Sequence, residues 1–184
     1  MIIDWPRGKY NVIYADPPWR FLTYSSKGRD RCPDARHYQT ITLDEIKQLP
    51  VGELANNDSV LLLWVPDSFI ELSFEVIKAW GFTYKTVGFY WTKVKKSGAE
   101  HIGTGYWTRS NPELCLLCTR GKPQRNSKSV RKWIHAPVRE HSRKPDEAYD
   151  RIEKLLNGPY IELFARQSRP GWDAWGDEVG IFDK

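Results

Sequence analysis

An acid, two prolines and a tryptophan follow directly on a short apolar run near the start of the chain. The run covers residues 10–15 and is rich in β-branched and aromatic side chains, which is typical of a buried strand. Pro17 and Pro18 restrict the backbone next to Asp16 to extended geometry, so the carboxylate and the neighbouring carbonyl groups form a stiff turn with many acceptors and few donors. Trp19 adds a flat apolar surface beside these acceptors. The combination suits a planar ligand that carries an amino group, such as a nucleobase.

A structural turn followed by a core tryptophan is the alternative interpretation of the same four residues. The functional interpretation is favoured because the turn stands at the carboxyl end of a strand, where open α/β sheets place their ligands. Residues 20–37, directly after it, are too charged and too rich in Gly and Ser for a core element. They predict a long loop that closes over a ligand, with simple disorder as the alternative.

The remaining chemistry-bearing residue types exclude several classes of protein. Lys and Arg outnumber Asp and Glu by 28 to 23, which favours an acidic partner but is also compatible with plain solubility. Cys115 and Cys118 have the spacing of half a zinc site, yet no second pair follows and the run around them is apolar, so we expect core residues and no metal. The chain shows neither a signal peptide nor an apolar run that could span a membrane, and a reducing, cytoplasmic setting is expected.

Alternating strand and helix patterns predict one domain that covers residues 1–184. Helices are expected at 42–49, where a capping box begins, at 68–80 with Gly81 after its end, and at 145–156. Strands are expected at 10–15, 59–65, 82–94, 113–119, 131–136 and 160–165, the last of them followed by an irregular tail. The predicted class is therefore α/β with a mainly parallel sheet.

Basic and aromatic residues gather after the strand predicted at 82–94. Lys93, Lys95 and Lys96 are followed by a glycine-containing loop that ends in Trp107 and Arg109. Cations hold phosphates while rings stack on bases, so this loop is the best candidate for a nucleic-acid contact, with a solvated hairpin as the alternative. The chain has nine tryptophans, and several stand at predicted strand ends or in loops, although most are expected in the core: Trp64, Trp91, Trp107, Trp172 and Trp175.

The order of these motifs resembles a known family, the S-adenosylmethionine-dependent N6-adenine methyltransferases related to the eukaryotic mRNA-adenosine methyltransferase, especially its small bacterial and phage members. The resemblance extends from about Lys9 to Gly180 and is carried by short segments that occur in the same order: 15–19, 61–65, 104–109, 141–147, 161–166 and 171–176. It implies a Rossmann-like methyltransferase sheet with permuted motif order and helices on both faces. The catalytic strand then comes early in the chain and the cofactor-binding strand late.

The resemblance also implies roles for individual residues. Asp16, Pro17, Pro18 and Trp19 would be catalytic: acceptors on the adenine N6 amino group orient it for direct methyl transfer, without a metal or a covalent intermediate. Residues assigned to S-adenosyl-L-methionine are Ala15, Asp16, Glu162, Phe164, Arg166, Ser168, Arg169, Asp177 and Glu178. Many relatives have Asn where this chain has Asp177, and the mRNA enzyme has Lys where this chain has Pro112, a missing cation for which Arg169 would compensate.

Nucleic acid is the expected partner, with DNA favoured over RNA. Candidate contacts are Tyr38, Lys93, Lys95, Lys96, Trp107, Arg109, Arg139, His141 and Lys144. The alternatives are an RNA adenine methyltransferase, methylation of cytosine N4 or of a protein side chain, and a non-catalytic nucleic-acid-binding subunit of a methyltransferase complex. The sequence leaves open a homodimer or a hetero-oligomer. A duplex substrate would require the adenine to be flipped out of the stack.

Overall fold

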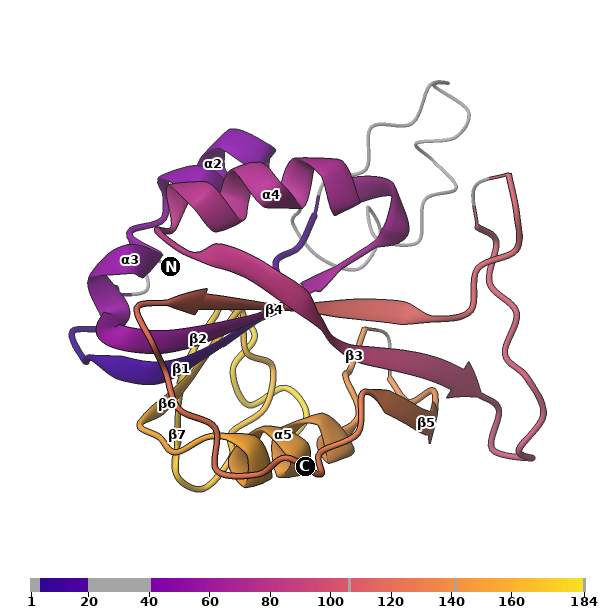
Figure 1. Cartoon of the computed structure of the whole chain (residues 1–184). Coiled ribbons are helices and arrows are strands. Elements are labelled where there is room, and N and C mark those ends of the chain that lie inside the picture. Colours follow the sequence, from indigo (N-terminus) through magenta and orange to yellow (C-terminus); the bar gives the residue numbers. More distant parts are fainter. Residues whose placement is uncertain (1–3, 20–40, 106, 141, 184) are drawn as a thin grey trace.

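A seven-stranded sheet forms the centre of the protein, with the strand order β5-β3-β4-β2-β1-β6-β7 (Figure 1). The computed structural model describes residues 4–19, 41–105, 107–140 and 142–183. The strands are β1 (Tyr10–Ala15), β2 (Ala55–Val65), β3 (Thr83–Val94), β4 (Glu113–Arg120), β5 (Trp133–Pro137), β6 (Tyr160–Leu163) and β7 (Trp172–Trp175). The helices are α2 (Leu43–Gln48), α3 (Val51–Leu54), the 3₁₀ turn η2 (Asp67–Phe69), α4 (Ile70–Ala79) and α5 (Asp146–Leu155).

The sheet is mainly parallel, as the sequence predicts. Only the two pairings of β4, with β2 and with β3, are antiparallel among the described strands. The central strand β1 pairs in parallel with β2 and with β6, so that Ala15 lies between Leu63 and Leu163. The carboxyl ends of these strands therefore meet at one edge, on either side of Asp16.

Helices cover both faces of the sheet, and alternation along β1 explains why. Ile13 and Ala15 point to the face covered by α2, α3 and α4, whereas Val12 and Tyr14 point to the face covered by α5. Figure 1 shows α2 and α4 on one side of the sheet and α5 on the other. A strand buried on both faces reads as a continuous apolar run, which is the pattern of this segment.

Most predicted elements are confirmed, and the differences concern short ones. The helix predicted at 42–49 begins with the expected capping box, in which Thr42 and Glu45 bind each other's backbone N–H groups. The strand predicted at 131–136 is β5, at the edge of the sheet. The long helix predicted at 68–80 begins as η2 before it becomes α4.

Two elements were not predicted. Residues 166–178 were expected to be irregular and 160–165 to be the last strand, but Trp172–Trp175 form β7, in parallel register with β6. This strand is short, and its two central residues are exposed, so it lacks an apolar run. The helix α3 directly follows Pro50, where the sequence indicated only the end of a helix.

The cysteines of β4 and most tryptophans belong to the core. Cys115 and Cys118 are buried, whereas Cys32 and the loop predicted at 20–37 lie outside the described residues. No cluster of potential metal ligands occurs in the described part of the chain. Trp64, Trp91 and Trp172 are buried, and Trp107 is 96% exposed. In the same described part, no helix is long and apolar enough to cross a membrane.

The packing of α5 on the sheet yields a stability prediction. Ile152 is fully buried beneath the sheet, so we expect Ile152→Ala to lower the free energy of unfolding by about 2–4 kcal/mol through lost contacts and a cavity. Ile181→Ala makes the same chemical change at a half-exposed position and should change it by less than about 0.5 kcal/mol. Urea denaturation measures both, and equal effects would contradict the assignment of Ile152 to the core.

Candidate active site

Charged side chains from four separate parts of the chain meet at the carboxyl edge of the central strands. Asp16 directly follows β1, Glu162 lies in β6, Glu113 is the first residue of β4, and Lys144 precedes α5. Because β4 runs in the opposite direction, its first residue lies at this edge, where Leu114 pairs with Val65 at the end of β2. Such an edge beside a central strand is where open α/β sheets bind ligands.

The turn after β1 is fixed by an aromatic network in the core. Trp19 donates from its Nε1 to the carbonyl oxygen of Trp64 at 3.1 Å, and Trp64 donates from its own Nε1 to the Tyr14 hydroxyl at 2.7 Å. Trp19 is 4% exposed and packs against Phe69. This corrects the prediction that Trp19 offers a stacking surface: the indole is engaged in the core, where it holds the turn in place.

Lys144 is the close partner of Asp16. Its Nζ lies 2.6 Å from Asp16 Oδ2 and 3.2 Å from Glu113 Oε2, and its side chain is 7% exposed. The same Nζ donates to the carbonyl oxygen of Ser142 at 3.3 Å and lies 5.5 Å from the centroid of the Trp64 ring. Lys144 was predicted to contact nucleic acid; in the structure its ammonium is instead buried between the carboxylates of Asp16 and Glu113.

Glu113 is a site residue that sequence reasoning missed. Its second oxygen, Oε1, lies 2.6 Å from Nζ of Lys93, another cation that had been assigned to polymer contact. Asp16, Lys144, Glu113 and Lys93 therefore form a row of alternating charges. An acid that opens an otherwise apolar strand was the available signal in the sequence.

The protonation states of this row follow from burial and from the neighbouring charges. Burial acts to lower the pKa of Lys144, but the carboxylates of Asp16 and Glu113 outweigh it and raise that pKa. Burial acts to raise the pKa of Glu113, but the two ammonium groups outweigh it and lower that pKa to about 2. For Asp16 burial prevails over Lys144, and its pKa is raised.

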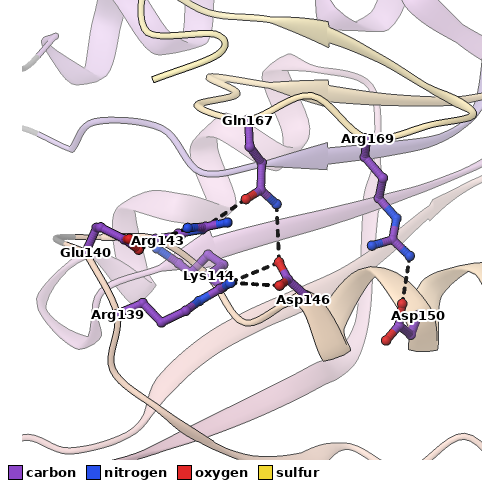
Figure 2. A network of polar contacts seen from close by, with 8 residues as sticks. All are labelled: Arg139, Glu140, Arg143, Lys144, Asp146, Asp150, Gln167 and Arg169. Carbon is purple, nitrogen blue, oxygen red and sulfur yellow. Dashed lines mark hydrogen bonds and ion pairs between the residues drawn. The ribbon is translucent and has the colours of Figure 1, made fainter. Parts of the chain in front are cut away.

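The segment that carries Lys144 is held by a second polar network, shown in Figure 2. Arg139 binds both carboxylate oxygens of Asp146, and its guanidinium also donates to the Lys144 carbonyl. Gln167 lies between Arg143 and Asp146 and binds both side chains (Figure 2). Arg139 was predicted to contact nucleic acid; in the structure its guanidinium fixes the backbone next to Lys144.

A small cavity opens beside Asp16 and is lined by four of the nine residues assigned to the cofactor, Asp16, Glu162, Phe164 and Arg166. The lining also includes Lys144, and the free volume of the cavity is about 20 Å³, the space of roughly one water molecule. Phe182 from the C-terminal segment also lines it, tied by its N–H to the Arg166 carbonyl. A larger ligand therefore requires this segment to move outward.

Glu162 is buried on the floor of this cavity. It is 8% exposed and accepts a hydrogen bond from the Tyr149 hydroxyl at 2.9 Å. Burial raises its pKa to about 8, against the hydrogen bond from Tyr149, which acts in the opposite direction. Glu162 is therefore mostly neutral at pH 7 and can both donate and accept a hydrogen bond.

The C-terminal residues assigned to the cofactor lie in different surroundings. Arg166 pairs with Glu178 at 3.0 Å, which brings these two predicted residues together, and the backbone N–H of Ser168 donates to Asp183. Arg169 instead reaches α5, where it binds Asp150 (Figure 2). It also binds Glu153 of the same helix. The prediction that Arg169 replaces a missing cation in the cofactor site is therefore wrong. Of the remaining assignments, Ala15 is buried and Asp177 is exposed.

The loop between β3 and β4 keeps an exposed basic and aromatic surface. Asn111 anchors its base, since its side chain accepts the Lys93 N–H and donates to the carbonyl oxygens of Lys93 and His101. Gly105 has φ +66°, and a Cβ there would lie 1.9 Å from the Thr108 carbonyl, so the tight turn requires glycine. The turn presents Trp107, and the predicted contacts Lys95, Lys96 and Arg109 are exposed as well. Two further predicted contacts, Tyr38 and His141, lie outside the described residues.

A mainly parallel sheet of this order, with an acidic turn after its central strand and a cavity with cationic side chains beside it, is that of a Rossmann-like methyltransferase. The MT-A70 family model matches residues 10–178, and the chain belongs to this family.

Several curated relatives resemble the chain over nearly its whole length. The Type II methyltransferase M.MunI of Mycoplasma sp is 34% identical over an alignment of 191 positions, which covers 95% of this chain and 79% of M.MunI. The N(6)-adenosine-methyltransferase catalytic subunit METTL3 of Homo sapiens is 34% identical over an alignment of 180 positions, which covers 94% of this chain and 28% of METTL3. The N(6)-adenosine-methyltransferase MT-A70-like of Arabidopsis thaliana is also 34% identical over an alignment of 180 positions, which covers 24% of its own length. The chain thus spans most of M.MunI but only a smaller part of the other two.

The raised pKa of Glu162 predicts a specific pH dependence of stability. Between its ordinary pKa, about 4.3 in the unfolded chain, and about 8 in the folded protein, the folded state holds one more proton, so stability falls as pH rises through this window. Glu162→Gln keeps an acceptor for Tyr149 but does not titrate. We expect the free energy of unfolding of the wild type, relative to this variant, to fall by up to about 1.4 kcal/mol per pH unit there. Urea denaturation at pH 5.5 to 8.5 measures it; parallel profiles would disprove the assignment.

Proposed function

We propose that the protein transfers a methyl group from S-adenosyl-L-methionine to the N6 amino group of adenine in nucleic acid, with DNA as the preferred polymer. The observation that carries the proposal is the acceptor turn at Asp16 and Pro17, fixed at the carboxyl edge of the sheet beside a cavity with two cations, Lys144 and Arg166. The names of the adenosine-methylating relatives support the target atom.

The residues around the cavity match the chemical groups of this cofactor. The guanidinium of Arg166 is suited to its carboxylate, and the carboxyl group of Glu162 is suited to its ribose hydroxyls. Phe164 and Phe182 provide apolar walls. When bound, S-adenosylmethionine supplies an electrophilic methyl group on a positively charged sulfur.

The chain's own contribution is to orient and polarise the target amino group. Its nitrogen lone pair is delocalised into the purine ring, and acceptors on its two N–H bonds shift electron density back to nitrogen. The Asp16 carboxylate is one acceptor. The Pro17 carbonyl is the other acceptor. It accepts a hydrogen bond from the backbone N–H of Trp19 at 2.8 Å, and its second lone pair remains for the amino group. Holding the nitrogen in line with the methyl group provides the rest of the rate enhancement.

The exposed loop between β3 and β4 is suited to hold the polymer. Lys95, Lys96 and Arg109 provide positive charge, and Trp107 provides a ring on which a base can stack. The base of this loop is joined to the active site, because Asn111 fixes the backbone of Lys93, whose ammonium binds Glu113. The base of the loop is thus connected to Asp16 through Lys93, Glu113 and Lys144.

DNA is favoured over RNA because the chain covers 79% of the bacterial Type II methyltransferase and only about a quarter of the two adenosine methyltransferases compared above. The test is incubation with labelled cofactor and duplex DNA, single-stranded DNA or RNA, followed by mass spectrometry of the nucleosides. N6-methyladenine in DNA is expected. Methylated RNA would reverse the choice of polymer, and N4-methylcytosine or the absence of any methylated base would contradict the proposed function.

Asp16→Ala tests the catalytic turn. We expect kcat to fall by at least about 10³-fold, since an acceptor that acts on the developing charge is lost, while the dissociation constant of the cofactor changes little. Asp58→Ala, at an exposed position in the first half of β2, is the control and should keep wild-type turnover. Turnover of Asp16→Ala within a few-fold of the wild type would refute the role of Asp16.

Arg166→Ala tests the cofactor site. Loss of a charge-assisted hydrogen bond should raise the dissociation constant of S-adenosylmethionine by about 10- to 100-fold, measured by calorimetry. Arg169→Ala is the matched control, because this guanidinium binds α5 and should leave the constant within about threefold. An unchanged constant for Arg166→Ala would remove this residue from the cofactor site.

A further inference from the structure

Lys144 and the target amino group compete for the same acceptor. The proposed function, on which this inference rests, requires Asp16 to accept a hydrogen bond from the adenine amino group, yet Nζ of Lys144 lies 2.6 Å from Asp16 Oδ2. A carboxylate that faces an ammonium at this distance has its charge largely compensated, so it polarises a second donor less strongly. Asp16 can therefore polarise the adenine amino group fully only if the Lys144 ammonium moves away from it.

Glu113 is within reach of the displaced ammonium. Its Oε2 lies 3.2 Å from the same Nζ, so a shift of a few tenths of an ångström makes it the closer partner. The Lys144 side chain is 7% exposed, and water therefore cannot replace a lost carboxylate. Among the described residues, Asp16 and Glu113 are the acids that form ion pairs with it.

Glu113 is itself held in position and remains ionised. Lys93 binds its other oxygen at 2.6 Å, and Asn111 fixes the backbone of Lys93. The two ammonium groups lower the pKa of Glu113 to about 2 although burial opposes this, so Glu113 is ionised at neutral pH and can accept the ammonium.

We propose that Lys144 moves from Asp16 to Glu113 when the target adenine binds, so that the amino group takes the place of the ammonium on Asp16. The exchange leaves no buried charge without a partner, which would otherwise be costly. Glu113 is then a positioning residue, because it acts on the substrate through Lys144 and Asp16. This assigns a function to a residue that contacts neither the methyl donor nor the base.

Glu113→Gln tests the exchange, because it removes the charge and retains the shape. With a neutral side chain at 113, Lys144 stays on Asp16. We expect kcat/KM for an adenine-containing duplex to fall by about 10- to 100-fold, with the dissociation constant of S-adenosylmethionine close to that of the wild type. The melting temperature should fall, because Lys144 and Lys93 each lose a carboxylate. Glu113→Asp keeps the charge and should restore part of the loss. Glu71→Gln, at an exposed position of α4, is the control and should leave all of these quantities unchanged.

The outcomes separate the inference from the function on which it rests. If the wild type is active and kcat/KM of the Glu113→Gln variant lies within about threefold of the wild-type value, the exchange alone is overturned. Equal losses in Glu113→Gln and Glu113→Asp, accompanied by weaker cofactor binding, show a merely structural role and also overturn it. A wild type that transfers no methyl group to any polymer overturns the proposed function and the exchange together.

Discussion

The ion pair between Asp16 and Lys144 is the constraint on which the rest of the site depends. Both side chains are largely withdrawn from water, and an uncompensated charge in such a place costs several kcal/mol. The protein meets this cost with further charges, Glu113 and Lys93, and with a backbone that is fixed around each of them. Charged side chains can thus be buried here because each of them lies next to a side chain of opposite charge.

The fold brings this row together from distant parts of the chain. Asp16 and Lys144 are separated by 128 positions, and only the parallel arrangement of β1, β2 and β6 places their segments at one edge. The helices on the two faces of the sheet then support different parts of the site. The face of α2 and α4 surrounds Trp19 and the acceptor turn, whereas the face of α5 buries Tyr149, which binds Glu162. Acceptor turn and cofactor cavity are therefore supported by opposite sides of the same sheet.

Strong local patterns predicted the long elements and the catalytic turn. In each case a few neighbouring residues are enough to predict the element. Examples are the apolar run before Asp16, the capping box at Thr42 and the helical period before Gly81. Contacts between side chains that are far apart in the sequence could not be predicted from such local patterns. A lysine in a polar segment looks like a surface cation, and nothing near Lys144 in the sequence shows that two carboxylates surround it. Arg169 illustrates the same limit, because its partners on α5 became visible only once β7 and the helix were placed.

Because β4 runs antiparallel to its neighbours, the length of the loop before it is independent of the register of the central parallel strands. Because β4 enters the sheet from the active-site edge, the loop before it can lengthen or shorten without shifting the register of β1 with β2 and β6. The pairing of β6 with β7 would be untouched by such changes, since both strands lie beyond β1 in the strand order. Exchange of residues 95–110 between relatives would therefore alter this loop alone, with Asn111 and Glu113 as the points of attachment.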